Sequence, residues 1–246
     1  MSAPGAQPQG AATEQSASAA VQSMFNSIAP SYDRLNHILS CNMDRLWWRR
    51  TARAFRPILL QPEAQIIDLC CGTGDLTLAL LRHRPKSGAP VLAIDFARAM
   101  LDRAAEKLPA GRATLVEADA LHLPIASNTA HLLTIAFGFR NLANYTAGLS
   151  EIHRVLRRGG EVGILDFSQP QGIMGALYPL YFQRILPRIG AWLSGASSAY
   201  EYLPQSVLRF PPPQEMLAMM RQCGFENLSW TPYTFGIAGL YRGVKA

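Results

Sequence analysis

The sequence predicts an α/β fold in which helices cover both faces of a doubly wound, mostly parallel β-sheet. Short apolar runs alternate with helical stretches through the middle of the chain, and several runs end at a glycine or an aspartate. Such alternation is typical of parallel sheets that are covered on both faces. The right-handed rule for strand–helix–strand crossovers then favours a doubly wound arrangement.

The composition suits one large domain with a short appendage. Of 246 residues, 49% are hydrophobic and 16% are charged, so the chain can bury a sizeable core. Four cysteines without a CxxC pair are too few for a disulfide scaffold and too scattered for zinc, which favours a reducing cytoplasm. We expect neither a signal peptide nor a membrane-spanning helix, because the most apolar stretch, 173–193, contains two arginines and two prolines.

The N-terminal quarter divides into two parts. Residues 1–23 have almost no bulky side chains, which predicts a disordered tail. From 24 to 60, apolar residues recur at three- and four-residue steps around Pro30, which predicts helices. Arginines between Arg45 and Arg56 share one side of a helical wheel, opposite Trp47, Trp48 and Phe55. Such a helix either lies on anionic lipid or docks on the core, and this stretch alone favours the second reading.

The remaining elements follow from the same patterns. Predicted strands cover 66–69, 91–94, 114–116, 132–137 and 162–167, with helices over 75–83, 97–108 and 147–157. The segment 171–212 is rich in aromatics and prolines and predicts helices or loops over the strand ends. A helix over 213–223 with Gly224 as its C-terminal cap leads to closing strands over 225–231 and 235–244, with Pro232 in the turn between them.

The strongest local signal lies at the first strand–helix junction. There Asp68 precedes two cysteines and the turn Gly72-Thr73-Gly74, after which a helix begins. Glycine in such a turn lets a ligand approach the main chain closely. Thr77 stands where a GxGxxG fingerprint has its third glycine, which argues against a pyrophosphate ligand. A tight turn without any ligand is the alternative.

Aspartates end the next two predicted strands. Asp95 lies 21 positions after Gly74, close to the spacing of about 20 at which a carboxylate binds a ribose diol. Asp119 ends the following strand, where it can accept a hydrogen bond from an adenine amino group. Each aspartate alone can be explained as a helix cap. Together with the glycine turn they indicate a pocket for a phosphate-free adenosine derivative, of which S-adenosylmethionine is the commonest.

Longer motifs make the chain similar to the UbiE/MenG family of class I methyltransferases, the quinone C-methyltransferases, from about Met24 to Lys245. The matching stretches are Tyr32 to Ser40 with Trp47, Phe137 to Asn141, Arg154 to Gly160, Asp166 to Ser168, Leu186 to Gly190, Tyr202 with Leu203, and Gly236 to Lys245. The resemblance implies a Rossmann-like fold with seven strands, the last one antiparallel. It also implies a methyltransferase domain over 61–246, N-terminal helices over 24–60 that cap the active site, and a substrate-covering insert at about 171–212.

The resemblance further implies which residues bind the cofactor, S-adenosylmethionine without a metal. It places cofactor contacts on Thr73, Asp95, Asp119, Ala120 and Ala136, the last at a position where the family often has Ser. With the junction residues, the predicted cofactor-binding set is Asp68, Gly72, Thr73, Gly74, Asp95, Asp119, Ala120 and Ala136. Four positions depart from the family's usual residues: Leu35, Asp44, Arg158 and Asp166 replace Met, His, Pro and Glu.

The implied reaction is methylation of a ring carbon of a prenylated quinol. A quinol hydroxyl resembles that of tyrosine, with a pKa of about 10, and its ionisation makes the adjacent carbon nucleophilic. Arg140 follows the fourth strand, where a guanidinium would favour the phenolate and orient a water. The predicted catalytic residues are Arg140, Asn141, Tyr32, Asp33 and Asp166. A structural ion pair of Arg140 with Asp33 or Asp166 is the alternative, and His37 is the histidine to test as a base.

Demethylmenaquinol is the favoured substrate, and 2-methoxy-6-polyprenyl-1,4-benzoquinol is the alternative. The net charge of +6 also fits a nucleic-acid methyltransferase, but no RNA-binding motif accompanies it. Methylation of another small acceptor and a cofactor-binding protein without turnover stay open as well. The expected partners are the polyprenylated quinol and membrane lipid, with a homodimer as a candidate and no nucleic acid. The expected location is the cytoplasm, peripheral at the inner face of the membrane.

Overall fold

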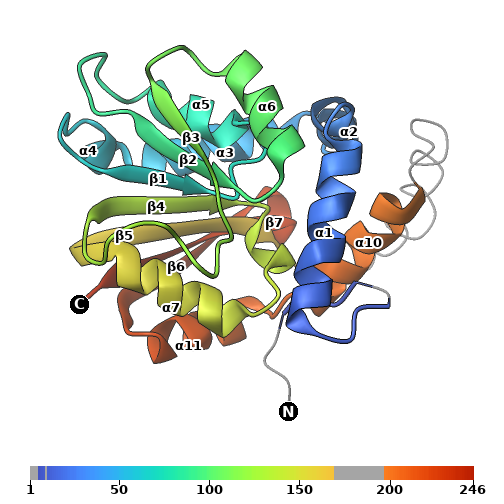
Figure 1. Ribbon diagram of the computed structural model, residues 1–246. Coiled ribbons are helices and arrows are strands. Elements are labelled where there is room, and N and C mark those ends of the chain that lie inside the picture. Colours follow the sequence, from blue (N-terminus) through green and yellow to red (C-terminus); the bar gives the residue numbers. More distant parts are fainter. Residues whose placement is uncertain (1–4, 9, 169–196) are drawn as a thin grey trace.

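The computed structural model describes residues 5–8, 10–168 and 197–246. Within them, seven strands form one sheet in the order β3-β2-β1-β4-β5-β7-β6 (Figure 1). Their bounds are β1 Ile66–Leu69, β2 Val91–Asp95, β3 Ala113–Glu117, β4 Ala130–Ala136, β5 Leu156–Phe167, β6 Phe225–Tyr233 and β7 Ala238–Lys245. Strands β1 to β5 are parallel, and β7 is antiparallel to both of its neighbours. The predicted fold class is therefore confirmed.

Helices pack on both faces of the sheet. One layer contains α3 (Met43–Ala54), α4 (Arg56–Leu59), α5 (Asp75–Leu81) and α6 (Arg98–Lys107), and the other contains α7 (Tyr145–Val155) and α11 (Pro213–Gln222) (Figure 1). Successive residues of β1 serve the two layers: Ile66 packs in the same apolar cluster as Leu80 of α5, and Ile67 in that of Leu149 of α7. Burial on both faces explains why this strand reads as an unbroken apolar run.

The prediction of a disordered tail over 1–23 is wrong for its second half. Helix α1 (Glu14–Ile28) begins at Thr13, whose side chain accepts from the amide of Ser16 in a capping box. Ala17 and Val21 are buried, and the Gln22 side chain donates to the carbonyl of Phe96 at 2.6 Å. Small residues pack here because a neighbouring element supplies the apolar surface that the segment lacks. In Figure 1, α1 lies across the edge of the sheet at which the parallel strands end.

Two further helices, α2 (Tyr32–Leu39) and α10 (Ser197–Arg209), lie at the same edge (Figure 1). The predicted insert at 171–212 is described only from Ser197 onward, and its first part lies outside the described residues. No helix in the described ranges has the length and apolar character needed to cross a membrane.

Two predicted boundaries move at the C-terminal strands and one prediction holds. Pro232 lies inside β6, opposite Gly239, and the turn is formed by the 3-10 helix η3 (Thr234–Gly236) instead. Proline is tolerated there because β6 is the last strand of the sheet and needs no donor on its outer side. Gly224 has φ +90° directly after α11, as expected of a C-terminal cap.

Candidate active site

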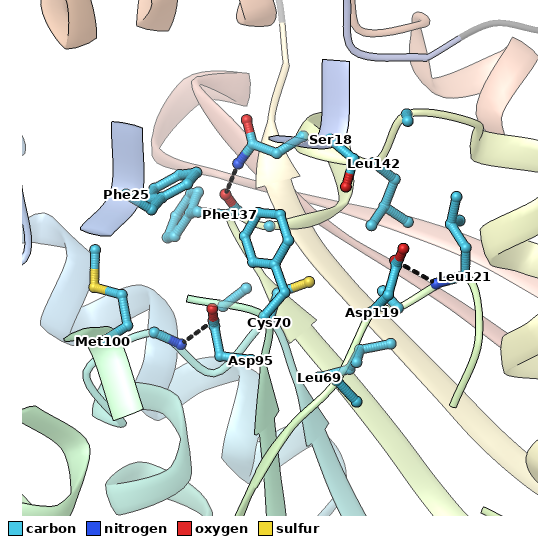
Figure 2. A pocket seen from close by; sticks show the side chains of 18 of the residues that line it. Ser18, Phe25, Leu69, Cys70, Asp95, Met100, Asp119, Leu121, Phe137 and Leu142 are labelled. Carbon is cyan, nitrogen blue, oxygen red and sulfur yellow. Dashed lines mark hydrogen bonds between the residues drawn. The ribbon is translucent and has the colours of Figure 1, made fainter. Parts of the chain in front are cut away.

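A pocket opens at the carboxyl ends of the parallel strands. Strand order reverses between β1 and β4, and ligands of open α/β sheets bind at such a switch point. We call this the main pocket; Figure 2 shows its lining. The described residues that line it come from α1, α2 and α6, from the first three strand ends, and from the end of β4 and the segment after it. They include Ser18, Phe25, Tyr32, Cys70, Gly72, Asp95, Met100, Asp119, Ala120, Ala136, Phe137, Asn141 and Leu142.

The glycine turn after β1 has the left-handed backbone that its sequence requires. Gly72 has φ +54° and Gly74 has φ +88°, and Gly74 precedes the first residue of α5. A Cβ on Gly74 would lie 3.1 Å from the side chain of Leu108, whereas the space beside Gly72 is open apart from Tyr32 at 3.9 Å. The turn therefore leaves room for a ligand against the main chain at Gly72.

Asp95 connects this turn to the end of β2. One carboxylate oxygen accepts from the Gly72 amide at 2.8 Å and the other from the Ala97 amide at 2.9 Å. The side chain is buried, and burial raises its pKa to about 6, although the amide hydrogen bonds oppose that shift. The carboxylate lines the main pocket, where its remaining lone pairs can accept from a diol.

The other predicted adenosine contacts lie in the same pocket. Asp119 accepts from the Leu121 amide at 2.9 Å through one oxygen, which orients the carboxylate and leaves the other oxygen available. Ala120 and Ala136 both line the pocket. Figure 2 shows Asp95 and Asp119 on either side of Cys70. A glycine turn without a Cβ, two oriented carboxylates and an apolar lining fit an adenosine-containing cofactor, and the described residues contain no cluster able to hold a metal ion.

Thr73 lies beside the main pocket in a smaller one, the Thr73 pocket, which Tyr32, Asn36, Trp48 and Gly72 also line. Its hydroxyl donates to Asp33 of α2 at 2.5 Å and accepts from Lys107 of α6 at 3.0 Å. Lys107 also forms ion pairs with Asp33 at 2.6 Å and with Asp75 at 3.0 Å. Asp33, a predicted catalytic residue, thus accepts a hydrogen bond from the glycine turn. It also belongs to a cluster of ion pairs that attaches α2 to this turn.

Asp68, a predicted cofactor residue, has no exposed surface. Its carboxylate accepts from the hydroxyls of Thr77 at 2.6 Å and Thr134 at 2.9 Å. Burial raises its pKa to about 7, against the effect of these two hydrogen bonds. The contacts indicate that Asp68 supports the turn from below by joining β1, β4 and α5.

Arg140 is paired with Asp166, one of the two alternatives open at the sequence level. The Arg140 guanidinium donates to Asp166 of β5 at 2.9 Å and to the Phe137 carbonyl at 2.5 Å, and its main-chain amide donates to the other Asp166 oxygen at 3.1 Å. Burial alone would lower the pKa of Arg140, but Asp166 and the nearby Tyr32 raise it above its usual value. The Nε–H is buried without a partner, so one donor is free for a ligand or water.

Tyrosines hold the 3-10 helix η1 (Phe139–Asn141) that carries this arginine. The Tyr145 hydroxyl donates to the Arg140 carbonyl at 3.0 Å, and the Tyr202 hydroxyl of α10 donates to the Asn141 side-chain oxygen at 3.1 Å. Burial raises the pKa of Tyr202 to about 12, so it stays protonated and donates at neutral pH. Among the described residues, Asn141 lines the main pocket whereas Arg140 does not.

Tyr32 and His37 have different surroundings although both belong to α2. Tyr32 lines both pockets, and burial raises the pKa of its hydroxyl, which Arg140 lowers in part. His37 lies 2.6 Å from Asp44 through Nδ1 and packs edge-on to Trp48. It lines neither pocket, which favours a structural role over that of a base.

Several residues of the site were not predicted. Lys107, Tyr145 and the apolar residues Phe25 and Met100 belong to helices whose orientation no local pattern specifies. Tyr202 is the exception, because it belongs to a motif shared with the quinone methyltransferases, although the motif gave it no role.

Comparisons with known proteins agree with this geometry. The model of the ubiE/COQ5 methyltransferase family matches residues 12–245. The chain is 45% identical over 229 residues to a demethylmenaquinone methyltransferase of Deinococcus radiodurans, covering 92% of each chain. It is 40% identical to a ubiquinone/menaquinone biosynthesis C-methyltransferase of Geobacter sulfurreducens, covering 92% of this chain and 88% of that one.

Among solved structures, an S-adenosylmethionine-dependent methyltransferase of Thermotoga maritima, described as a possible histamine N-methyltransferase, has a similar fold. The TM-score is 0.64 at 14% identity, covering 92% of this chain and all of that one. At this identity the likeness concerns the fold alone. The family match over nearly the whole chain and the long alignments at 40–45% identity nevertheless establish that this chain belongs to the ubiE/COQ5 methyltransferase family and is an S-adenosylmethionine-dependent methyltransferase.

Proposed function

We propose that the protein transfers the methyl group of S-adenosylmethionine to a ring carbon of a prenylated quinol, and that demethylmenaquinol is the favoured candidate substrate. The buried Arg140–Asp166 pair beside Asn141, at the pocket formed by Asp95 and Asp119, is the observation that carries the proposal. The named activity of relatives at 40–45% identity gives the substrate class. The benzoquinol of ubiquinone biosynthesis is the second candidate, because one of these relatives is named for both pathways.

The cofactor would be held by its sugar, base and turn contacts. Asp95 would accept from the ribose hydroxyls, Asp119 from the adenine amino group, and the main chain at Gly72 would face the methionine part. S-adenosylmethionine supplies an electrophilic methyl group on a sulfonium. The apolar lining of the pocket, with Phe25, Met100 and Phe137 among its members, excludes water from this group.

The substrate ring must lose a hydroxyl proton before its carbon can attack the methyl group. As the new carbon–carbon bond forms, the sulfur–methyl bond breaks and S-adenosylhomocysteine leaves. The ring hydrogen at the methylated carbon is then lost as a proton to water, which restores the aromatic quinol.

A cationic Arg140 favours the phenolate through its charge, which acts on the pocket beside Tyr32, and its unpartnered Nε–H can orient a water that accepts the proton. Asn141 lines the pocket with its amide oriented by Tyr202 and Phe137, so it can hold a ring oxygen. Tyr32, which lines both pockets, would close over the ring. Holding the two reacting atoms about 3–3.5 Å apart is then the main contribution of the site.

The proposal also covers organisation and location. Residues 24–60 cap the active site, and α10, which belongs to the predicted insert at 171–212, covers the substrate. The enzyme acts in the cytoplasm and contacts the membrane peripherally, because a polyprenylated quinol resides in the bilayer. The observations that support this are Tyr32 and Trp48, which line the pockets, and Tyr202, which bonds to Asn141.

Radiolabel transfer tests the proposed activity. The protein is incubated with methyl-labelled S-adenosylmethionine and a short-chain demethylmenaquinone or methoxybenzoquinone, each with and without a reductant. We expect label on the ring only in the reduced samples, and more of it on the naphthoquinol. Measurable cofactor binding without label on either ring would contradict the quinol assignment and leave methylation of another acceptor.

A further inference from the structure

The outer surface of α3 carries arginines that have no partner. Arg45, Arg49, Arg53 and Arg56, together with Arg82 after α5, are exposed, and none of their side chains forms an ion pair or hydrogen bond within the described part of the chain. Some exposed arginines elsewhere in the protein are paired, such as Arg98 with Asp102, and the partly buried Arg242 pairs with Glu161. The unpaired positive charges repel one another, so an anion that binds between them lowers the electrostatic free energy of this surface.

Part of this surface is hollowed. A groove between α3 and α5 is lined by Arg45, Arg49 and Arg82, with His37, Trp48 and Leu78 beside them. Asp75 also lines the groove and shares Lys107, at 3.0 Å, with Asp33, so it offsets only part of the positive charge of the three arginines. Trp48 and Asp75 line the Thr73 pocket as well, so these two side chains separate the groove from the pocket at the glycine turn.

Exposed apolar side chains lie on α3 and on two elements that contact it. Leu46 of α3 and Ile38 of α2 are 43% and 46% exposed. Phe235, in the turn η3, is 81% exposed and has φ +56°, a left-handed backbone that is costly for an aromatic residue. Nothing in the described core holds the ring in that position.

The turn with Phe235 lies against α3. The Trp47 indole donates to the Thr234 hydroxyl at 2.8 Å, and the Arg50 guanidinium lies 4.4 Å from the centre of the Tyr233 ring. The turn immediately precedes β7, which begins at the edge where the parallel strands end. The Phe235 turn therefore adjoins the Trp47–Arg50 side of α3, and the groove beside Arg45 and Arg49 adjoins the Thr73 pocket through Trp48.

We propose that the arginine face of α3, with Leu46 and the Phe235 turn, is the surface that docks on an anionic phospholipid bilayer. Unpaired arginines bind headgroup phosphates, and exposed apolar side chains beside them enter the interface between headgroups and acyl chains. Nucleic acid fits less well, because its backbone offers no apolar layer for Leu46 and Phe235. The inference deepens the proposed function, because docking at this face would bring the pockets to the bilayer that holds a prenylated quinol.

Vesicle sedimentation with the full chain tests this surface without any quinol. We expect binding to phosphatidylglycerol vesicles, weaker binding to phosphatidylcholine, and loss of binding at high salt. The triple variant R45Q/R49Q/R53Q should bind phosphatidylglycerol roughly 100-fold more weakly. The variant Phe235→Asn should bind phosphatidylglycerol vesicles more weakly than the wild type, by up to roughly tenfold. Asparagine suits the left-handed backbone at this position, so the turn should keep its conformation.

A matched control removes the same charge elsewhere. Arg157, Arg158 and Arg221 are also exposed and unpaired, but they lie at the start of β5 and on α11. The variant R157Q/R158Q/R221Q should keep wild-type vesicle binding within about threefold, as expected for charges outside the contact.

Four results would overturn the docking surface: vesicle binding by R45Q/R49Q/R53Q equal to that of the wild type, an equal loss in the control variant, equal binding of the wild type to both lipids, or wild-type binding to an RNA oligonucleotide but not to vesicles. Methylation of a short-chain quinol in solution is measured in parallel. Its failure would contradict the proposed function and leave the vesicle result standing.

Discussion

The two sides of this site, to which we assign the cofactor and the substrate, are built in different ways, and we call them the cofactor side and the substrate side. At the ends of β1 and β2, a turn and one carboxylate are joined by main-chain amides, as Asp95 accepts from Gly72 and Ala97. After β4, the site depends on side chains from distant elements: Asp166 of β5 holds Arg140, and Tyr202 of α10 holds Asn141. The turn and Asp95 are held by main-chain amides at two neighbouring strand ends, whereas Arg140 and Asn141 are held only when β5 and α10 are in place.

This difference predicts that substitutions on the substrate side lower kcat, whereas substitutions on the cofactor side raise the Kd for S-adenosylmethionine. The largest effect is expected for Arg140→Ala. It removes the cation beside the pocket and leaves Asp166 buried without its partner, so kcat should fall roughly 1,000-fold and stability by about 3–5 kcal/mol. Activity assays and urea unfolding measure the two effects.

Arg140→Lys separates them, because it keeps the buried charge but not the planar group that reaches Asp166 and Phe137 together. It should recover most of the stability and little of the turnover. Full activity in this variant would show that the guanidinium has no specific role.

Asp95→Ala should give the second-largest effect. Without the carboxylate, the Gly72 amide loses its acceptor and a ribose diol loses its partner, so the Kd for S-adenosylmethionine should rise roughly 10- to 100-fold. Isothermal titration measures this value. Asp95→Asn is the matched control for charge, and a Kd unchanged in both variants would remove Asp95 from the cofactor site.

Asp68→Asn should stabilise the protein at alkaline pH. Burial raises the pKa of Asp68 to about 7, above its unfolded value near 4, so the folded state binds a proton that the unfolded state loses first. Wild-type stability should therefore fall as the pH rises from about 4 to 7. The variant should be more stable than the wild type by roughly 1–3 kcal/mol at pH 8 and equal to it at pH 4.

Thermal and urea unfolding across this range check the prediction. Asp95 contributes in the same direction, since burial raises its pKa to about 6, so part of the fall should persist in the variant. A wild-type stability that rises between pH 4 and 7 would contradict the buried, proton-binding state of both aspartates.

Tyr202→Phe should give the smallest effect. It removes one hydrogen bond to Asn141 and no packing surface, which corresponds to a loss in kcat of roughly 2- to 10-fold. The Kd for the cofactor should not change, because Tyr202 does not line the main pocket among the described residues. A changed Kd for the cofactor with a normal kcat would contradict the assignment of Tyr202 to the substrate side.

The same contrast explains what could be predicted from the sequence. Strand ends and turn residues have local signatures, so the glycine turn, Asp95 and Asp119 could be identified as neighbours before their contacts were known. Arg140 can be identified through a longer motif, but the motif leaves its partner open between Asp33 and Asp166. In the structure, Arg140 forms its ion pair with Asp166, and Asp33 forms an ion pair with Lys107.

Other features had no usable local signature. Lys107 reaches Asp33 and Thr73 only because α6 ends beside the cofactor turn, which depends on the packing of α6. The order of residues 14–23 also depends on tertiary contacts, since Ala17 and Val21 are too small to indicate a core by themselves. Thr13 is a residue type favoured at helix N-caps, but position 16 has Ser instead of the Glu or Gln that marks a capping box in a sequence, so the local signal is weak.

The most direct test of the two-sided site measures Kd for S-adenosylmethionine and single-turnover methylation of a reduced demethylmenaquinol in the same preparations of Asp95→Ala and Arg140→Lys. The account predicts a crossed result. Asp95→Ala should have a weakened Kd and near-normal methylation at saturating cofactor, and Arg140→Lys a normal Kd and strongly reduced methylation. Equal changes of both quantities in both variants would contradict the division of the site.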